Sequence, residues 1–307
     1  MAVVAKPEII QDHVYFQQIT NAIGTKDYLK VLTYIGAAVL SLLSFSLLFS
    51  LFVTKKLLTF GANLGASLST RLFRYYMNQG WLFHSERNSA ELTTRISAET
   101  YRTTQGIIQP LLNLVSKSVL ALFIAASIFL LNPLVAIVGL LIFGTAYGTI
   151  YTLTKNKLKR NGEIISNVAV IRFRAMSEGF GSIKDTLLLN LQTKFADQFA
   201  TNSQLVAKGQ SENQFYSSAP RYIIELIAYG AIIGLVMYLI ITRYGQLDQI
   251  LPIISIYALA GFKLMPALQN IFFCITQIKA NKAAFENIKE DLQRSDISIV
   301  QGNEAIS

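Results

Sequence analysis

The feature that most constrains this chain is a stretch of 37 residues, Ser118 to Thr154, without a single charged side chain. The hydrocarbon core of a bilayer is about 30 Å thick, so a helix that rises about 1.5 Å per residue crosses it in about 20 residues. The stretch is too long for one crossing. Asn132-Pro133 divides it, because Asn-Pro favours a turn and proline cannot donate to a continuing helix. The sequence therefore predicts two membrane-spanning helices joined by a tight turn, from about Ile107 to Leu131 and from Leu134 to about Thr154.

Three further apolar stretches predict three further spans. Val31 to Val53 is 23 residues without a charge, Leu226 to Thr242 follows a start near Pro220, and about Gln249 to Ile278 is interrupted only by Lys263. Hydrophobic residues make up 52% of the chain and charged residues only 15%, whereas a soluble domain carries about 25% charged residues. We therefore expect an all-α polytopic membrane protein with about five spanning helices.

Basic residues gather on one side of these spans. The segments 55–106, 155–218 and 279–307 together hold 20 of the 27 Lys and Arg. Basic residues favour the cytoplasmic side of a membrane. We therefore expect these segments and the C-terminus in the cytoplasm, and the chain in the plasma (inner) membrane. On this topology residues 1–27 are an extracytoplasmic segment, 28–278 the transmembrane domain and 279–307 a cytoplasmic C-terminal segment.

The two charged segments between spans predict long helical hairpins. Apolar residues recur at helical spacing in both, for example Leu64, Leu68 and Leu72 in the first. We expect each segment to be two helices that meet at a break, near Gly80 to Ala90 in the first and near Gly179 to Gly181 in the second. An arm of 25 to 30 residues extends about 35 to 45 Å at 1.5 Å per residue. The sequence thus predicts two tips with short helices, each far from the membrane.

The tips resemble the coupling helices of exporter-type ABC transporters. Residues 83–99 read FHSERNSAELTTRISAE, similar to the first coupling helix of that family, in which Gly-Glu-Leu precedes an arginine and an acidic residue; Ala90 stands where the family usually has glycine. Residues 177–185 read SEGFGSIKD, similar to the second coupling helix. Pro220-Arg221 with Glu225 resembles the subgroup that includes flippases of lipid-linked oligosaccharides. The resemblance covers roughly residues 10–295.

This resemblance implies the transmembrane domain of an ABC exporter of the type IV fold. In that family two transmembrane halves form the pathway, and the tips dock on ATP-binding domains that bind ATP and Mg. The residues implied in this docking are Ser85, Glu86, Arg87, Ala90, Glu91, Glu178, Gly179, Phe180, Gly181 and Lys184. The first of the family's six helices is missing. No G-x-x-x-x-G-K-[ST] is present, so we expect the ATPase elsewhere and no enzymatic activity in this chain.

Charged and amide residues inside the predicted spans are candidates for the substrate path. An intramembrane charge costs at least about 3 kcal/mol and usually faces a water-filled path or a partner. Each candidate also has a structural interpretation: a lysine near a span end can snorkel, residues four apart can form an ion pair, and a mid-span lysine can satisfy a neighbouring helix. The candidates are Lys117, Arg221, Glu225, Lys263, Gln269 and Asn270. Their positive charge favours an anionic amphiphile such as a lipid-linked saccharide, whereas peptide or drug export stays open.

Other features favour packing. Cys274, the only cysteine, is expected to be a small buried hydrophobe. The pairs Gly61/Gly65, Gly144/Gly148 and Gly230/Gly234 have the spacing that permits close helix approach. At the first tip Glu86, Glu91 and Glu99 alternate with Arg87, Arg95 and Arg102, and this pattern favours a solvated face for most of these charges. With only two histidines, far apart, no metal site is expected.

Three functions remain as alternatives. An ABC exporter half requires two such halves, the bilayer, an ATPase partner and no nucleic acid. An ATP-independent channel or scaffold, or a non-functional transporter fragment, requires no ATPase, so a neighbouring reading frame with a P-loop discriminates between the two. A membrane enzyme would need a catalytic constellation, and the sequence contains no Ser-His-Asp set, no H-E-x-x-H and no placed carboxylate pair.

Overall fold

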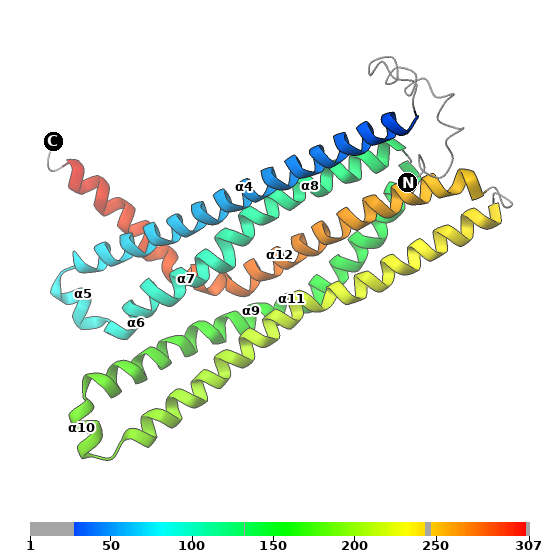
Figure 1. Ribbon diagram of the computed structural model, residues 1–307. Helices are drawn as coiled ribbons and strands as arrows, with labels where there is room; N and C mark the ends of the chain where they lie inside the picture. The colour runs from blue at the N-terminus through cyan, green and yellow to red at the C-terminus, as the bar shows by residue number, and fades with distance from the viewer. Residues whose placement is uncertain (1–27, 132, 243–246, 305–307) are drawn as a thin grey trace. The chain divides into compact units, whose positions relative to one another are not determined.

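The computed structural model of the chain describes residues 28–131, 133–242 and 247–304, and these residues are helical apart from short turns. This confirms the all-α prediction for the described part of the chain. The elements in chain order are α4 (Tyr28–Met77), α5 (Trp81–Glu86), α6 (Ser89–Thr94), the π-helical turn η1 (Arg95–Glu99), α7 (Thr100–Thr103), the π-helical turn η2 (Thr104–Ile108), α8 (Gln109–Leu131), α9 (Pro133–Gly181), α10 (Ile183–Leu188), α11 (Gln192–Thr242) and α12 (Leu247–Glu304) (Figure 1).

Three helical stretches among the described residues are long and apolar enough to cross a membrane. They are Gly36–Met77, Ser89–Leu130 and Pro133–Gly181. They overlap the first three predicted spans, which supports a membrane protein. The fourth and fifth spans, expected on α11 and α12, stay predictions, and so do the side of the C-terminus and the membrane. The segment 1–27 lies outside the described residues.

The long arms predicted from the sequence are present. The helix that contains the first span continues from Val53 to Met77, which is about 36 Å at 1.5 Å per residue. The helix that begins at Pro133 continues past Thr154 to Gly181. Pro133 occupies the first position of α9, where its missing N–H costs no hydrogen bond. The predicted turn between the second and third spans is thus bounded by the helix ends at Leu131 and Pro133.

Two details differ from the expected boundaries. Helix α9 runs through the predicted break at Gly179 to Gly181, and the chain leaves the helix only at Ser182. Pro220, expected near the start of a span, lies inside the continuous helix α11. The arm before Pro220 and the expected span after it are therefore parts of one helix.

The chain forms two units, Met1–Leu57 with Ala228–Lys263 and Leu58–Ile227 with Leu264–Ser307. The contacts described below all lie within the second unit. Its largest hydrophobic cluster joins α4, α6 and α12, and contains the buried side chains Leu72, Tyr75, Tyr76, Leu92, Ile288 and Leu292. A smaller cluster of Ile165, Val168 and Val206 joins α9 to α11.

Glycines allow the closest helix contacts of this second unit. A Cβ on Gly65 would lie 2.5 Å from Thr104, one on Gly61 would lie 2.9 Å from Gln109, and one on Gly162 would overlap the backbone carbonyl of Ala280. The packing role predicted for Gly61/Gly65 is confirmed. The other two predicted pairs are different: a Cβ on Gly144, Gly148, Gly230 or Gly234 would meet nothing within 4 Å in the described structure.

Candidate functional site

The first tip comprises residues 78–99, and its turn is built by local capping. The side chain of Asn88 accepts a hydrogen bond of 2.8 Å from the backbone N–H of Ala90, so α6 begins at Ser89. This is the usual N-cap geometry, which satisfies an N–H that the helix leaves free. Ala90, which stands where the resembling family has glycine, is buried and helical, and Asn88 makes the turn instead.

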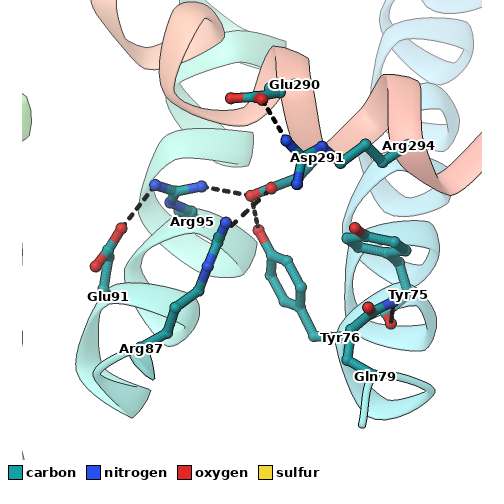
Figure 2. A network of polar contacts seen from close by, with 9 residues as sticks. All are labelled: Tyr75, Tyr76, Gln79, Arg87, Glu91, Arg95, Glu290, Asp291 and Arg294. Carbon is teal, nitrogen blue, oxygen red and sulfur yellow. Dashed lines mark hydrogen bonds and ion pairs between the residues drawn. The ribbon is translucent and has the colours of Figure 1, made fainter. Parts of the chain in front are cut away.

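A buried carboxylate ties this tip to α12. Figure 2 shows Asp291 of α12 facing Tyr76, Arg87 and Arg95. The Tyr76 hydroxyl donates to Asp291 Oδ2 at 2.6 Å, and Arg95 Nη1 donates to the same oxygen. Arg87 Nη1 lies 3.5 Å from Asp291 Oδ1. Each donor comes from a different element, namely the end of α4, the linker between α5 and α6, and η1. The carboxylate thus joins four separate segments.

The surroundings of this carboxylate explain how its burial is tolerated. The Asp291 side chain is only 2% exposed, and a buried charge is costly unless it is paired and hydrogen-bonded. Two guanidinium groups and a phenol supply that pairing, and the Tyr76 pKa is raised by burial and by its bond to Asp291. Tyr76 lies 23 residues past Val53, about 35 Å beyond the charge-free part of α4. The network therefore lies outside the apolar segment of that helix.

Aromatic stacking fixes the linker arginine. The Arg87 guanidinium lies 4.5 Å from the centre of the Phe83 ring, and the Phe83 ring is stacked on Tyr76 at 5.9 Å. Arg95 also pairs with Glu91 at 2.6 Å on the adjacent turn. The orientation of α5 thus depends on the same contacts that hold the Asp291 carboxylate.

The predicted docking residues of the first tip fall into two groups. Ser85 and Glu86 are exposed, as a docking surface requires. Arg87 and Glu91 are half-buried in the network around Asp291, and Ala90 is buried. The first group is available to a partner, whereas the second group holds the tip in shape.

The second tip, residues 177–191, presents apolar side chains. Its predicted docking residues Glu178, Phe180, Gly181 and Lys184 are exposed, whereas Gly179 is half-buried, and a Cβ at that position would lie 3.5 Å from the Phe195 ring. The Thr186 hydroxyl donates to the Ser182 carbonyl at 3.0 Å and stabilises the turn. Asn190, with φ of 54°, closes α10 in the left-handed conformation that asparagine tolerates.

A second buried network lies next to the first along the chain. The Glu99 side chain is 1% exposed, and its Oε2 accepts from Ser166 at 3.1 Å and lies 3.5 Å from Arg102 Nη1. Arg102 also donates to Ser166 at 2.7 Å and to Asn281 at 3.3 Å. Burial raises the pKa of the Glu99 carboxyl, and the Arg102 guanidinium opposes this shift. Glu99 and Arg102 lie before the apolar segment that begins near Ile107.

The solvated face expected for the charges of the first tip is therefore wrong for Glu99, Arg95 and Arg102. The π-helical turns η1 and η2 flank α7, and a π turn closes i→i+5 hydrogen bonds that change the facing of the residues after it. In the structure Arg95 faces α12 while Glu99 faces α9. Both charges consequently lie between helices.

A polar cavity of about 230 Å³ adjoins this second network. Its lining comes from α7, η2, α9, α11 and α12 and is rich in amide side chains: Tyr101, Arg102, Gln105, Gly106, Ile165, Gln210, Asn213, Gln214, Gln277, Ala280 and Asn281. The Asn213 amide oxygen is buried and has no hydrogen-bond partner within the described chain. No pattern in the sequence indicates this cavity, because its lining residues come from separate elements of the chain.

Three of the predicted substrate-path residues meet. Arg221 Nε donates to Glu225 Oε1 at 2.9 Å, and Gln269 Nε2 lies 3.5 Å from the same oxygen. This is the ion pair that the i,i+4 spacing indicated, with an added amide from α12. Lys117 is half-buried, whereas Lys263 and Asn270 are exposed on this single chain. Cys274 is buried, as expected of a small hydrophobe.

The central residue of the first network was missed. Asp291 carries a detectable signal, because it falls on the buried face defined by Ile288, Leu292 and Ser295 at helical spacing. An acidic residue in the middle of such a stripe requires a buried donor. The first-tip arginines were the available candidates.

No family model matches this chain. Among the residues that the structure describes, no group of three or more His, Cys, Asp or Glu side chains is placed to hold a metal ion. The arrangement offers two shaped tips on long arms, one of them fastened to α12 through buried charges.

Proposed function

We propose that the chain is the transmembrane half of an ATP-driven ABC exporter or flippase, with the two tips docking on ATP-binding domains in the cytoplasm. Two such halves would enclose the substrate path. The residues of this chain supply the path and the levers, and the partner domain supplies ATP hydrolysis with Mg. The resemblance of the tip sequences to coupling helices supports this proposal.

The single observation that carries it is the apolar surface of the tips. Trp81 and Phe180 are 84% and 76% exposed, and Leu188 is 78% exposed. Phe180 lies 26 residues past Thr154, about 40 Å beyond the apolar segment, so lipid does not cover it on the predicted topology. Exposed apolar groups that gather in one place are typical of protein interaction sites. A partner protein at the tips accounts for them.

The proposed mechanism is alternating access. Closure of two ATP-binding domains would move both tips, and the long helices α4, α9 and α11 would transmit that motion toward the spans. Alternating access would then open the path to each side in turn. Within the spans, the Arg221–Glu225–Gln269 cluster and the lysines Lys117 and Lys263 would meet the substrate. Their net positive charge favours an anionic amphiphile such as a lipid-linked saccharide, since arginine matches phosphate oxygens in a bidentate manner.

The test begins with the coding DNA that flanks this chain. A P-loop domain in frame after Ser307, or in a neighbouring reading frame, identifies the ATPase to express with it. The pair is purified in nanodiscs, and ATP hydrolysis is compared between the parent and Phe180→Ser. The control is Leu205→Ser, which changes another exposed apolar residue of the same hairpin, far from the tip.

We expect the rate of ATP hydrolysis to fall at least about tenfold in Phe180→Ser, because a buried aromatic anchor contributes about 2 kcal/mol or more to an interface. The rate should change little in Leu205→Ser. If a P-loop partner is found and both variants hydrolyse ATP like the parent, docking at the second tip is wrong. Absence of any P-loop partner favours an ATP-independent channel or scaffold, or a non-functional fragment.

A further inference from the structure

The residues around Asp291 connect the first tip to α12, the helix that carries Gln269. The first tip is where a partner would dock, and α12 is the helix that carries Gln269 of the polar cluster with Arg221 and Glu225. Asp291 lies 22 residues after Gln269 on the same continuous helix, about 33 Å along its axis. A load applied at the first tip thus has a direct route to α12 through this carboxylate.

The contacts at this point are unusually concentrated. Besides the three donors to its carboxylate, the adjacent Leu292 carbonyl accepts from Arg71 Nη2 at 2.9 Å, and Ile288 and Leu292 are buried in the cluster with Leu72 and Leu92. Apolar burial alone is non-directional and lets two helices slide. Charge-assisted hydrogen bonds have defined geometry, so they fix the register between the tip and α12.

A surface ion pair would not do this. One residue earlier on α12, Glu290 pairs with Arg294 at 2.6 Å, but both side chains are more than half exposed. Exposed pairs contribute little, because water and salt screen them. Figure 2 places the two pairs side by side: the Glu290–Arg294 pair stays on α12, whereas the contacts of Asp291 reach the first tip. The chain therefore offers its own matched control.

We propose that Asp291 is a positioning residue that makes the first tip and α12 move as one body, so that docking at the tip is transmitted to the polar cluster at Gln269. This rests on the proposed function for the identity of the docking partner. The fastening itself does not depend on that partner, because every contact lies within this chain. Its three donors act on one carboxylate, so its removal releases α4, the α5–α6 linker and η1 together.

The first experiment measures hydrogen exchange of the purified chain alone. Asp291→Asn keeps the shape of the side chain but removes the charge that Arg87 and Arg95 share. We expect exchange of peptides covering 78–95 and 285–295 to become at least about 10-fold faster, because Arg87 and Arg95 lose the buried charge that pairs with them and these segments open more often. Glu290→Gln should leave both peptides unchanged, and the second tip should exchange as before in each variant. Equal exchange in Asp291→Asn and Glu290→Gln would overturn the fastening.

The second experiment distinguishes a role of Asp291 in transmission from a merely structural role. The ATPase partner is added with a non-hydrolysable ATP analogue, and exchange is followed in a peptide covering 265–281. We expect the parent peptide to respond to the analogue, Asp291→Asn to lose the response while the second tip is still protected by docking, and Asp291→Glu to restore it in part. Tyr76→Phe, which removes one neutral donor and keeps the charges, should retain most of the response. A full response in Asp291→Asn would overturn transmission. If no partner docks on the parent, the proposed function and the transmission role are both wrong, and the result of the first experiment on the contact between the tip and α12 is unaffected.

Discussion

Gly162 is the position where a single methyl group should separate two helices. In the structure a Cβ at this position would overlap the backbone carbonyl oxygen of Ala280, inside the 3.0 Å that real Cβ atoms keep. Backbone cannot rotate away, so α9 and α12 must move apart in Gly162→Ala. Alanine is a better helix former than glycine by about 1 kcal/mol, which opposes the effect. Overpacking costs about 1–3 kcal/mol, and here the obstacle is backbone, so the steric term should exceed the helix gain. We expect a net loss of about 1–2 kcal/mol, or a Tm lower by about 2–8 °C.

The assay uses the chain's own cysteine. Cys274 is buried and is the only cysteine in the sequence, so a thiol-reactive dye reports unfolding in detergent without added labels. Gly144→Ala is the control on the same helix, because its new Cβ would meet nothing within 4 Å. Gly106→Ala should fall between the two, since it would meet the side chain of Asn281, which can move. A Tm for Gly162→Ala equal to or above that of Gly144→Ala would refute the close contact of α9 and α12.

Two further predictions concern the buried carboxylate of Glu99 and the lysine of the predicted fifth span, Lys263. Glu99→Gln should destabilise the chain by about 2 kcal/mol or more, because Arg102 would keep its buried charge without a carboxylate, and an unchanged Tm in the same dye assay would show that the pair does not form. Position 263 should face a water-filled path, so Lys263→Cys, on a Cys274→Ala background in vesicles, should react with a membrane-impermeant maleimide. The control is Leu140→Cys, on an exposed apolar face of α9, and equal reactivity of the two cysteines would contradict a path at Lys263.

The apolar helices could be predicted from the sequence because charged side chains are costly in hydrocarbon. A helix in a bilayer cannot carry many charges, so charge-free stretches marked the helices that end at Leu131 and begin at Pro133. The arms followed from helical spacing and the absence of proline. The stop of α9 at Ser182 rather than at Gly179 was not predictable, because glycine weakens a helix without ending it.

The buried charge networks could not be predicted from the same patterns. Alternating Glu and Arg at helical spacing looks identical on a solvated face and between two helices. The π-helical turns decide the difference here, since they point Arg95 and Glu99 toward different neighbours. Asp291 found its partners more than 190 residues earlier in the chain, a distance at which periodicity carries no information. Its place in an apolar stripe on α12 was the one readable signal.

Site-specific cross-linking of the tips to the ATP-binding domain would decide whether the tips dock there. Single cysteines are placed at Leu82 and Leu188 on the tips and at Leu205 on the arm, each in a Cys274→Ala background, and a short bifunctional reagent is added to the complex with ATP. If the tips dock, both tip positions should give a cross-linked product of the chain with the ATP-binding domain, and Leu205 should give none. No product from either tip, or equal product from Leu205, would contradict a docking role for the tips and with it the exporter function.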